Sequence, residues 1–237
     1  KLSDWMEHHR ICADAVRGRV PLWSIILDPS VHQALEKIKL LEELGYDGAE
    51  VMNPAVQLRA DDEIFSWFKY LTDNTDMAIC LYRTQVSGIV MNWDLMQRLA
   101  DLPTVVAVKN GVINRSEVIK LRQILRKDFI VSDPIEYFFL EDLRIGGQMI
   151  WGDPGYILFG KKRYLAREYV ALAHAGRWEE ARVKWDLLNP IREFYADIFL
   201  WPLLRSGAYA GALGDMKVIC GMIGLKAGPM LPPMPLV

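Results

Sequence analysis

Two stretches of the 237-residue chain decide the fold, Met77-Ala-Ile-Cys-Leu-Tyr-Arg83 and Thr104-Val-Val-Ala-Val-Lys-Asn110. Each is a nearly continuous apolar run that ends in polar residues. Such runs are typical of strands that are buried on both faces of a parallel sheet. The segment between them carries an amphipathic stripe formed by Trp93, Met96 and Leu99. The sequence therefore predicts two parallel strands joined by a helix.

The same alternation of strand-like and helix-like segments covers the first 153 residues. Strand-like runs recur about every 20 to 30 residues, the length of a repeating βα unit. From residue 156 onward these runs disappear and long helical stretches take over. We therefore predict an α/β domain over residues 1–155 and a C-terminal appendix of three helices over residues 156–237. The other predicted strands are Val20–Leu27, Gly48–Asn53, Phe129–Ser132 and Gln148–Trp151. The predicted appendix helices are Tyr156–Ala175, Trp178–Leu200 with a break or kink near Pro190, and Ala208–Leu225.

Composition and charge exclude several classes of protein. The 28 Lys and Arg residues nearly balance the 30 Asp and Glu residues, so no strong field attracts nucleic acid or an anionic membrane. The longest apolar runs, such as Phe199–Leu204, are far shorter than the roughly 18 residues of a membrane span. Three cysteines, Cys12, Cys80 and Cys220, are too few for a disulfide framework. We expect a cytoplasmic protein whose partner is a small molecule.

Lys109 ends the apolar run that begins at Val105. A lysine at the end of a buried parallel strand is desolvated, paired or exposed at a mouth, and desolvation favours the neutral, nucleophilic amine. Such an amine can form a Schiff base with a carbonyl group. In a (β/α)8 barrel the active site lies at the carboxyl ends of the strands, so position and chemistry agree. The alternative is a lysine that has left the strand and extends to water.

Tyr82 ends the preceding strand in the same way. Neighbouring strands of a parallel barrel place their carboxyl ends side by side, so we expect Tyr82 close to Lys109. A phenol at this place can relay protons during imine formation and during cleavage of a carbon–carbon bond. Taken alone, Tyr82 would more commonly be a core aromatic residue with a satisfied hydroxyl. The joint placement of the two residues favours catalysis.

The segments of these two residues and two further segments resemble the pyruvate-dependent class I aldolases typified by dihydrodipicolinate synthase and N-acetylneuraminate lyase. The matching segments are the strand of Tyr82, the run Leu99–Lys109, the pair Gly146-Gly147 before Trp151, and Gly211–Val237 with its Gly-Leu-Lys-Ala-Gly-Pro motif. The resemblance covers essentially the whole chain and implies a (β/α)8 TIM barrel followed by helices. It also implies that Lys109 is the Schiff-base lysine, that Tyr82 relays protons, and that the backbone around Trp151 lines the substrate pocket.

Two departures from the family pattern help to decide which member this is. In the synthases an arginine a few residues after the strand tyrosine binds a substrate carboxylate. The segment Arg83-Thr-Gln-Val-Ser87 has no arginine at the matching position, so Arg83 could take this role only from a different direction. Pro54-Ala-Val-Gln57 stands where the synthases often have Pro-Tyr-Tyr, so the tyrosine that relays protons in the neighbouring subunit is missing. Both absences count against dihydrodipicolinate synthase itself. The ending Lys226-Ala-Gly-Pro-Met-Leu-Pro-Pro233 is similar to hydratase-aldolases.

Other candidates for a chemical role are weaker. Asp133 and Asp153 follow strand-like runs and could contact substrate, although each could instead cap the next helix. The four histidines lack carboxylate or cysteine companions at metal-ligand spacing, so we expect no metal. A Schiff-base mechanism needs no cofactor.

The leading functional hypothesis is a lyase in which Lys109 forms an imine with pyruvate or another 2-oxo acid, and a bond to an aldehyde is made or broken. Alternatives within the family are a hydratase-aldolase and a sugar-acid dehydratase. A non-catalytic 2-oxo acid binder is the alternative from another class, and the absence of the arginine and of the relay tyrosine motivates it. The resemblance also implies a homo-oligomer, a dimer or a tetramer.

Length gives a further expectation about the barrel. A complete (β/α)8 barrel takes roughly 250 residues, but the C-terminal part of this chain is helical and only six strands are predicted. The chain also opens on a helix, predicted over Ser3–Arg17. We therefore expect residues 1–155 to supply strands 3 to 8. About two βα units, roughly 60 residues, would precede Lys1. In the family that stretch carries the loop that binds the pyruvate carboxylate.

Overall fold

The computed structural model of the chain describes residues 2–54, 58–112, 114–151, 154–206 and 209–234. The chain divides into two compact units, Lys1–Asp133 and Pro134–Val237, which we describe separately. The predicted α/β domain extends to residue 155, beyond this division, and its boundary stays a prediction. Over the described parts of the chain, no helix combines the length and the apolar character that crossing a bilayer requires.

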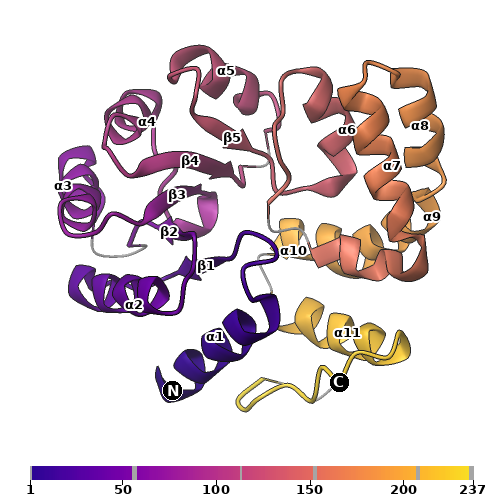
Figure 1. Cartoon of the computed structure of the whole chain (residues 1–237), viewed down its shortest axis with the longest axis horizontal. Coiled ribbons are helices and arrows are strands. Elements are labelled where there is room, and N and C mark those ends of the chain that lie inside the picture. Colours follow the sequence, from indigo (N-terminus) through magenta and orange to yellow (C-terminus); the bar gives the residue numbers. More distant parts are fainter. Residues whose placement is uncertain (1, 55–57, 113, 152–153, 207–208, 235–237) are drawn as a thin grey trace. The chain divides into compact units, whose positions relative to one another are not determined.

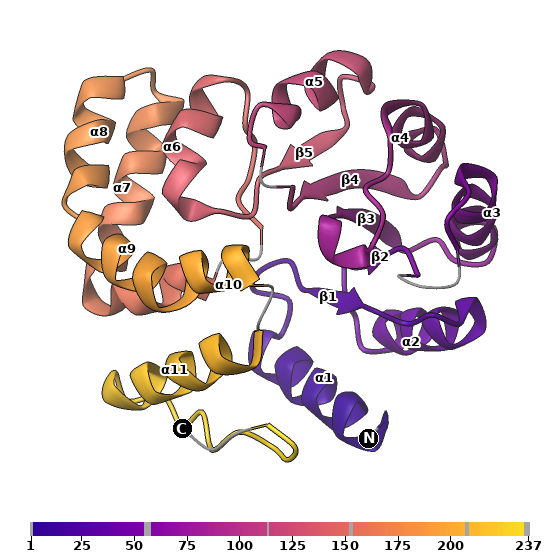
Figure 2. The ribbon, with the colours of Figure 1, turned by 180° about the vertical axis from the view of Figure 1, so that it is seen from behind.

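The first unit is built on a five-stranded parallel sheet in the order β1-β2-β3-β4-β5. Figure 1 and the reverse view in Figure 2 place helices α2 to α5 as an outer layer along one face of this sheet. The strands are β1 (Trp23–Ile26), β2 (Gly48–Met52), β3 (Ala78–Arg83), β4 (Val105–Asn110) and β5 (Ile130–Ser132). The helices are α1 (Leu2–Val16), α2 (Val31–Glu43), α3 (Asp61–Thr72), α4 (Trp93–Ala100) and α5 (Glu117–Ile124), with a short 3₁₀ helix, η1 (Gln85–Ser87).

The sequence specifies the ends and the buried faces of these helices locally. Ser30 accepts a hydrogen bond from the backbone N–H of Gln33 and so caps α2, and Asn92 caps α4 in the same way. The inner face of α2 consists of apolar residues spaced three or four apart, which are fully or almost fully buried. The chain then leaves α2 through Gly45 at φ +77°, a backbone conformation that a side chain would strain.

Gly48 shows how closely the first two strands approach one another. A Cβ atom at this position would lie 2.4 Å from the indole ring of Trp23 in the neighbouring strand β1. The two residues are partners in the parallel register. Only glycine leaves room for the ring at the start of β2.

The predicted strand over Gln148–Trp151 is wrong. These residues form extended chain with a single bridge residue, Ile150, and they belong to the second unit. Four residues with mixed polarity do not distinguish an extended connection from a strand. The other five predicted strands are confirmed, each shortened at one or both ends.

The second unit is helical, as predicted, although its helices are shorter. The break predicted near Pro190 within Trp178–Leu200 is confirmed: the helix is interrupted at Leu187 and Leu188, because Pro190 occupies the first turn of the next helix. Residue 208, where the last predicted helix begins, lies outside the described residues. The elements are α6 (Glu136–Arg144), the 3₁₀ segment η2 (Pro154–Lys162), α7 (Arg163–His174), α8 (Trp178–Asp186), α9 (Asn189–Tyr195), the π-helical turn η3 (Ala196–Leu200), α10 (Trp201–Ser206) and α11 (Tyr209–Met222).

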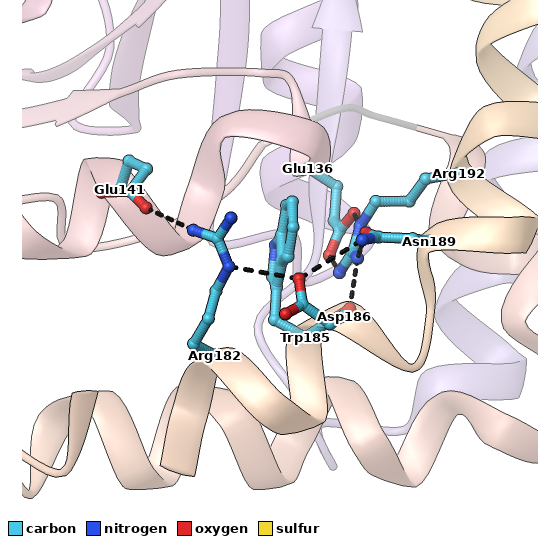
Figure 3. A network of polar contacts seen from close by, with 7 residues as sticks. All are labelled: Glu136, Glu141, Arg182, Trp185, Asp186, Asn189 and Arg192. Atoms are coloured by element: carbon cyan, nitrogen blue, oxygen red, sulfur yellow. Dashed lines mark hydrogen bonds and ion pairs between the residues drawn. The ribbon is translucent and has the colours of Figure 1, made fainter. Parts of the chain in front are cut away.

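A buried ion pair organises this second unit (Figure 3). Arg192 of α9 binds Glu136 of α6 through two hydrogen bonds, of 2.5 Å from Nε and 2.8 Å from Nη2. The guanidinium also donates to the Asn189 side chain and to the Trp185 carbonyl, and it lies 3.9 Å from the centre of the Trp185 ring. Burial and the charge of Glu136 raise the pKa of Tyr169, so its hydroxyl stays protonated and donates to Glu136 at 2.9 Å.

The chain offers a direct comparison between this buried arginine and an exposed one. We expect Arg192→Met to lower the free energy of unfolding by about 3–5 kcal/mol, because it leaves the buried carboxylate of Glu136 without its countercharge. Arg182 in the same network is half-exposed and pairs with Glu141 and Asp186, so Arg182→Met should cost less than about 1 kcal/mol. Urea denaturation followed by tryptophan fluorescence measures both. Equal losses would contradict the assignment of stability to the buried pair.

Candidate active site

Lys109 and Tyr82 lie side by side at the carboxyl ends of β4 and β3. The two residues are partners in the parallel register of these strands. The Nζ atom of Lys109 lies 4.0 Å from the centre of the Tyr82 ring, and the lysine side chain is buried. The joint placement expected from the sequence is therefore present in the fold, while the catalytic roles of the two residues stay a prediction.

The parallel register sorts the residues around Lys109 onto two faces of the sheet. Side chains alternate along a strand, and register partners on neighbouring strands share a face. Glu50 pairs with Cys80, and Lys109 pairs with both Tyr82 and Ser132. Cys80 and Tyr82 are two residues apart on β3 and therefore point to the same face, so the side chains of all five residues share that face. The intervening residues turn to the other face, which the helices α2 to α5 cover.

Glu50 of β2 is the residue on this face that the sequence analysis missed. Its Oε1 atom accepts a hydrogen bond from Lys109 Nζ at 2.9 Å, across 59 residues of sequence. Both side chains are at most 10% exposed, so the pair is desolvated. The sequence carried one signal, a single carboxylate inside the apolar strand Gly-Ala-Glu-Val-Met, but nothing in it identified the lysine as the partner.

Cys80 lies beside this pair and is not a competing acid or base. Its side chain is fully buried. Burial raises the pKa of the thiol strongly, and the negative charge of Glu50 raises it further, while the positive charge of Lys109 opposes these effects. The thiol therefore stays protonated, and Glu50 is the group next to the amine that can accept a proton.

Arg83 lies on the opposite face from Lys109. Its guanidinium is buried and donates to the Met91 carbonyl at 2.8 Å, to the Asn110 side chain at 2.8 Å and to Glu117 of α5 at 2.5 Å. It also stacks on the Trp93 ring at 4.7 Å. These contacts join β3 and β4 to α4 and α5. Substrate binding by Arg83 stays a prediction, but every contact that the structure gives it is structural.

The other predicted site residues are placed as follows. Asp133 is fully buried and pairs with Arg115 Nη1 at 2.6 Å, within the first unit. Trp151 lies half-buried in the second unit, so the structure does not place it relative to Lys109. Asp153 lies outside the described residues. Substrate contacts of these three residues stay predictions.

Two buried amides lie at the carboxyl edge of the sheet and were also missed. Neither polar atom of the Asn53 side chain has a hydrogen-bond partner in the described part of the chain, and the same holds for the amide nitrogen of Asn110. A buried polar group without a partner costs about 1–3 kcal/mol. Unsatisfied groups of this kind are found more often at functional sites than in a plain core.

Comparison with known proteins decides the family. The model of the dihydrodipicolinate synthetase family matches residues 2–234. The chain belongs to this family. A 4-hydroxy-tetrahydrodipicolinate synthase of Rhodopseudomonas palustris is 30% identical over 145 residues, which are 60% of this chain and 49% of that protein. A synthase of Rhodospirillum centenum is 28% identical over 238 residues, covering 96% of this chain and 75% of its own length. The chain thus spans about half of the first of these relatives.

Solved structures of the family have the same fold. A dihydrodipicolinate synthetase from Pseudomonas aeruginosa, described as putative, matches with a TM-score of 0.81 at 20% identity over 98% of this chain and 76% of that one. The Thermotoga maritima synthase matches with a TM-score of 0.79 at 19% identity over 97% and 75%. A synthase described as a monomeric variant matches with a TM-score of 0.76 at 20% identity over 97% and 73%. The predicted fold class is confirmed as a partial parallel α/β barrel of this family with C-terminal helices.

The placement of Arg83 generates a prediction about its role. We expect Arg83→Met to lower the free energy of unfolding by about 1–3 kcal/mol, because Glu117 and Asn110 lose their partner. We expect no change in the concentration of 2-oxo acid that half-saturates the protein, because the side chain faces away from Lys109. Glu117→Gln is the matched control, since it weakens the same contact from the other side. A several-fold rise in the half-saturating concentration with Arg83→Met alone would instead show that Arg83 binds the substrate carboxylate.

Proposed function

We propose that the protein is a class I aldolase, a lyase in which Lys109 forms a Schiff base with pyruvate or another 2-oxo acid and a carbon–carbon bond to an aldehyde is made or broken. The observation that carries the proposal is the buried amine of Lys109 beside the Tyr82 ring at the carboxyl edge of the sheet, where active sites of barrels lie. Membership of the dihydrodipicolinate synthetase family supports it.

The chemistry follows from an imine as an electron sink. The Lys109 amine attacks the ketone carbon, and loss of water gives a protonated imine whose positive charge stabilises the enamine formed when a bond at C3 breaks. The enamine and an aldehyde are then the two partners of condensation or cleavage. Tyr82 moves protons to the carbinolamine oxygen and to the aldehyde oxygen, a role that its position beside the nitrogen permits.

The proposal extends to the family's outcomes other than simple aldol cleavage. The C-terminal motif similar to hydratase-aldolases favours a reaction that adds water before the bond is cleaved. A sugar-acid dehydratase would use the same imine. A non-catalytic member would instead bind a 2-oxo acid as a sensor or scaffold, without turnover. We place the protein in the cytoplasm as a homo-oligomer, by analogy with the family.

Borohydride trapping tests the proposal at its first step. With pyruvate or a related 2-oxo acid, reduction should add the mass of the reduced adduct to the peptide that contains Lys109. Lys109→Arg should abolish the adduct, because a guanidinium keeps the charge opposite Glu50 but forms no imine. Lys37→Arg is the matched control, because Lys37 also pairs with a buried carboxylate, that of Asp28, and this variant should trap like the parent protein.

The result that contradicts the proposal is equally specific. If no 2-oxo acid gives an adduct on Lys109 of the folded parent protein, the Schiff-base function is wrong. A panel of aldehydes, with product analysis, then separates aldolase from dehydratase in a protein that traps. Binding of a 2-oxo acid that survives Lys109→Ala, with no turnover by the parent protein, would favour the non-catalytic binder.

A further inference from the structure

A proton acceptor is needed wherever a buried ammonium must become a nucleophile. An ammonium has no lone pair, so the amine of Lys109 must lose one proton before it attacks a carbonyl and a second before the imine is complete. In a desolvated site bulk water does not perform these transfers readily, so a side chain must. The tyrosine that serves a neighbouring subunit in synthases is absent from the segment after Asn53.

Glu50 occupies the place where such an acceptor is useful. Its carboxylate lies 2.9 Å from the nitrogen, which is within the distance for direct proton transfer. Glu50 pairs with Cys80, whereas Lys109 pairs with Tyr82, two residues further along β3. The carboxylate therefore approaches the nitrogen from deeper in the sheet, on the side away from the carboxyl edge.

The contacts of Lys109 leave it free to react. An ammonium has three N–H donors, and the structure gives Lys109 Nζ one hydrogen-bond partner in the described residues, Glu50. The face of the Tyr82 ring stabilises the positive charge of the ammonium, and this contact is not a hydrogen bond from an N–H group to oxygen. Rotation about the Cε–Nζ bond can then turn the lone pair, once formed, from the carboxylate toward the substrate.

We propose that Glu50 is the acid–base residue of the imine-forming step, taking a proton from Lys109 and returning it to the departing oxygen. This inference rests on the proposed Schiff-base function.

The protons and electrons balance within this step. The Lys109 ammonium gives one proton to the Glu50 carboxylate, and the nitrogen lone pair forms the C–N bond while the carbonyl π electrons move to oxygen. A second proton then passes from nitrogen to that oxygen through the Tyr82 hydroxyl, which gives the neutral carbinolamine. Glu50 finally protonates the hydroxyl group. The C–O bond breaks with both electrons on the oxygen of water, and the protonated imine and the carboxylate remain.

The other groups near the pair do not take this role. Cys80 stays a thiol because burial, with the charge of Glu50, raises its pKa. Tyr82 and Ser132 share the face but carry hydroxyl groups, and a neutral hydroxyl is a poor acceptor for an ammonium proton at neutral pH. Within the described residues of this face, Glu50 is the carboxylate next to the nitrogen.

The rate of borohydride trapping with pyruvate tests the inference. We expect Glu50→Gln to slow trapping at neutral pH by at least about tenfold, the lower range of general-base effects. We expect the difference in trapping rate between Glu50→Gln and the parent protein to become smaller as pH rises, because hydroxide then removes the proton that Glu50 would take. Glu50→Asp keeps the carboxylate at a longer distance and should restore part of the rate. Asp28→Asn, which alters the lysine–carboxylate pair on the helix side, is the matched control and should trap at the parental rate.

The outcomes separate this inference from the function on which it rests. No adduct in the parent protein overturns the proposed function and the role of Glu50 together. Trapping in the parent, with Glu50→Gln equally fast at every pH, overturns the role of Glu50 alone. If Glu50→Gln does not fold, Glu50→Asp decides between the two roles. A purely structural role of Glu50 predicts that any folded variant traps at the parental rate. A role as the base predicts that folded Glu50→Asp traps more slowly than the parent protein.

Discussion

The parallel register of β2, β3 and β4 is the constraint on which the candidate site depends. The backbone hydrogen bonds between these strands decide which residues lie opposite Tyr82 and Glu50, whatever side chains those residues carry. Because side chains alternate along each strand, one set of polar residues lies on the same face as Lys109 and another lies on the face that the helices cover. A shift of one residue between two strands would exchange the sets and bring Arg83 to the face that now holds Tyr82. The backbone, rather than any single contact, fixes which chemistry is possible.

The Lys109–Glu50 pair of the first unit and the Arg192–Glu136 pair of the second are both buried, and they differ in how many hydrogen-bond donors of the cation are used. Arg192 directs four hydrogen bonds to Glu136, Asn189 and the Trp185 carbonyl, and it stacks on an indole ring. A guanidinium held in this way is fixed in place and always charged. Within the described residues, the Lys109 side chain has one hydrogen bond, to Glu50, and one ring contact, with Tyr82. The contacts of Arg192 stabilise the folded unit, whereas those of Lys109 leave a nitrogen that can change its hydrogen-bond partner.

The sequence was sufficient for five of the six predicted strands and for the pairing of Lys109 with Tyr82, because continuous apolar runs and their polar ends are local signals. It failed at Gln148–Trp151, where a short run of mixed polarity has no such signal. Glu50 could not be matched to Lys109, because the contact spans 59 residues and depends on the register of three strands. The orientation of Arg83 was in principle available, since adjacent residues of a strand point to opposite faces and Tyr82 precedes it.

A proton acceptor within the same sheet has a consequence for assembly. In the synthases that this chain resembles, one segment often supplies a tyrosine to the proton relay of the neighbouring subunit. Here the segment that would carry it reads Pro54-Ala-Val-Gln57, while Glu50 lies three residues before the end of the predicted strand and already contacts the nitrogen. If Glu50 supplies the acceptor, imine formation needs no residue from a second copy. The segment without a relay tyrosine and the buried carboxylate beside the lysine are then two parts of one arrangement, in which the proton acceptor of the first chemical step comes from the same sheet as the lysine.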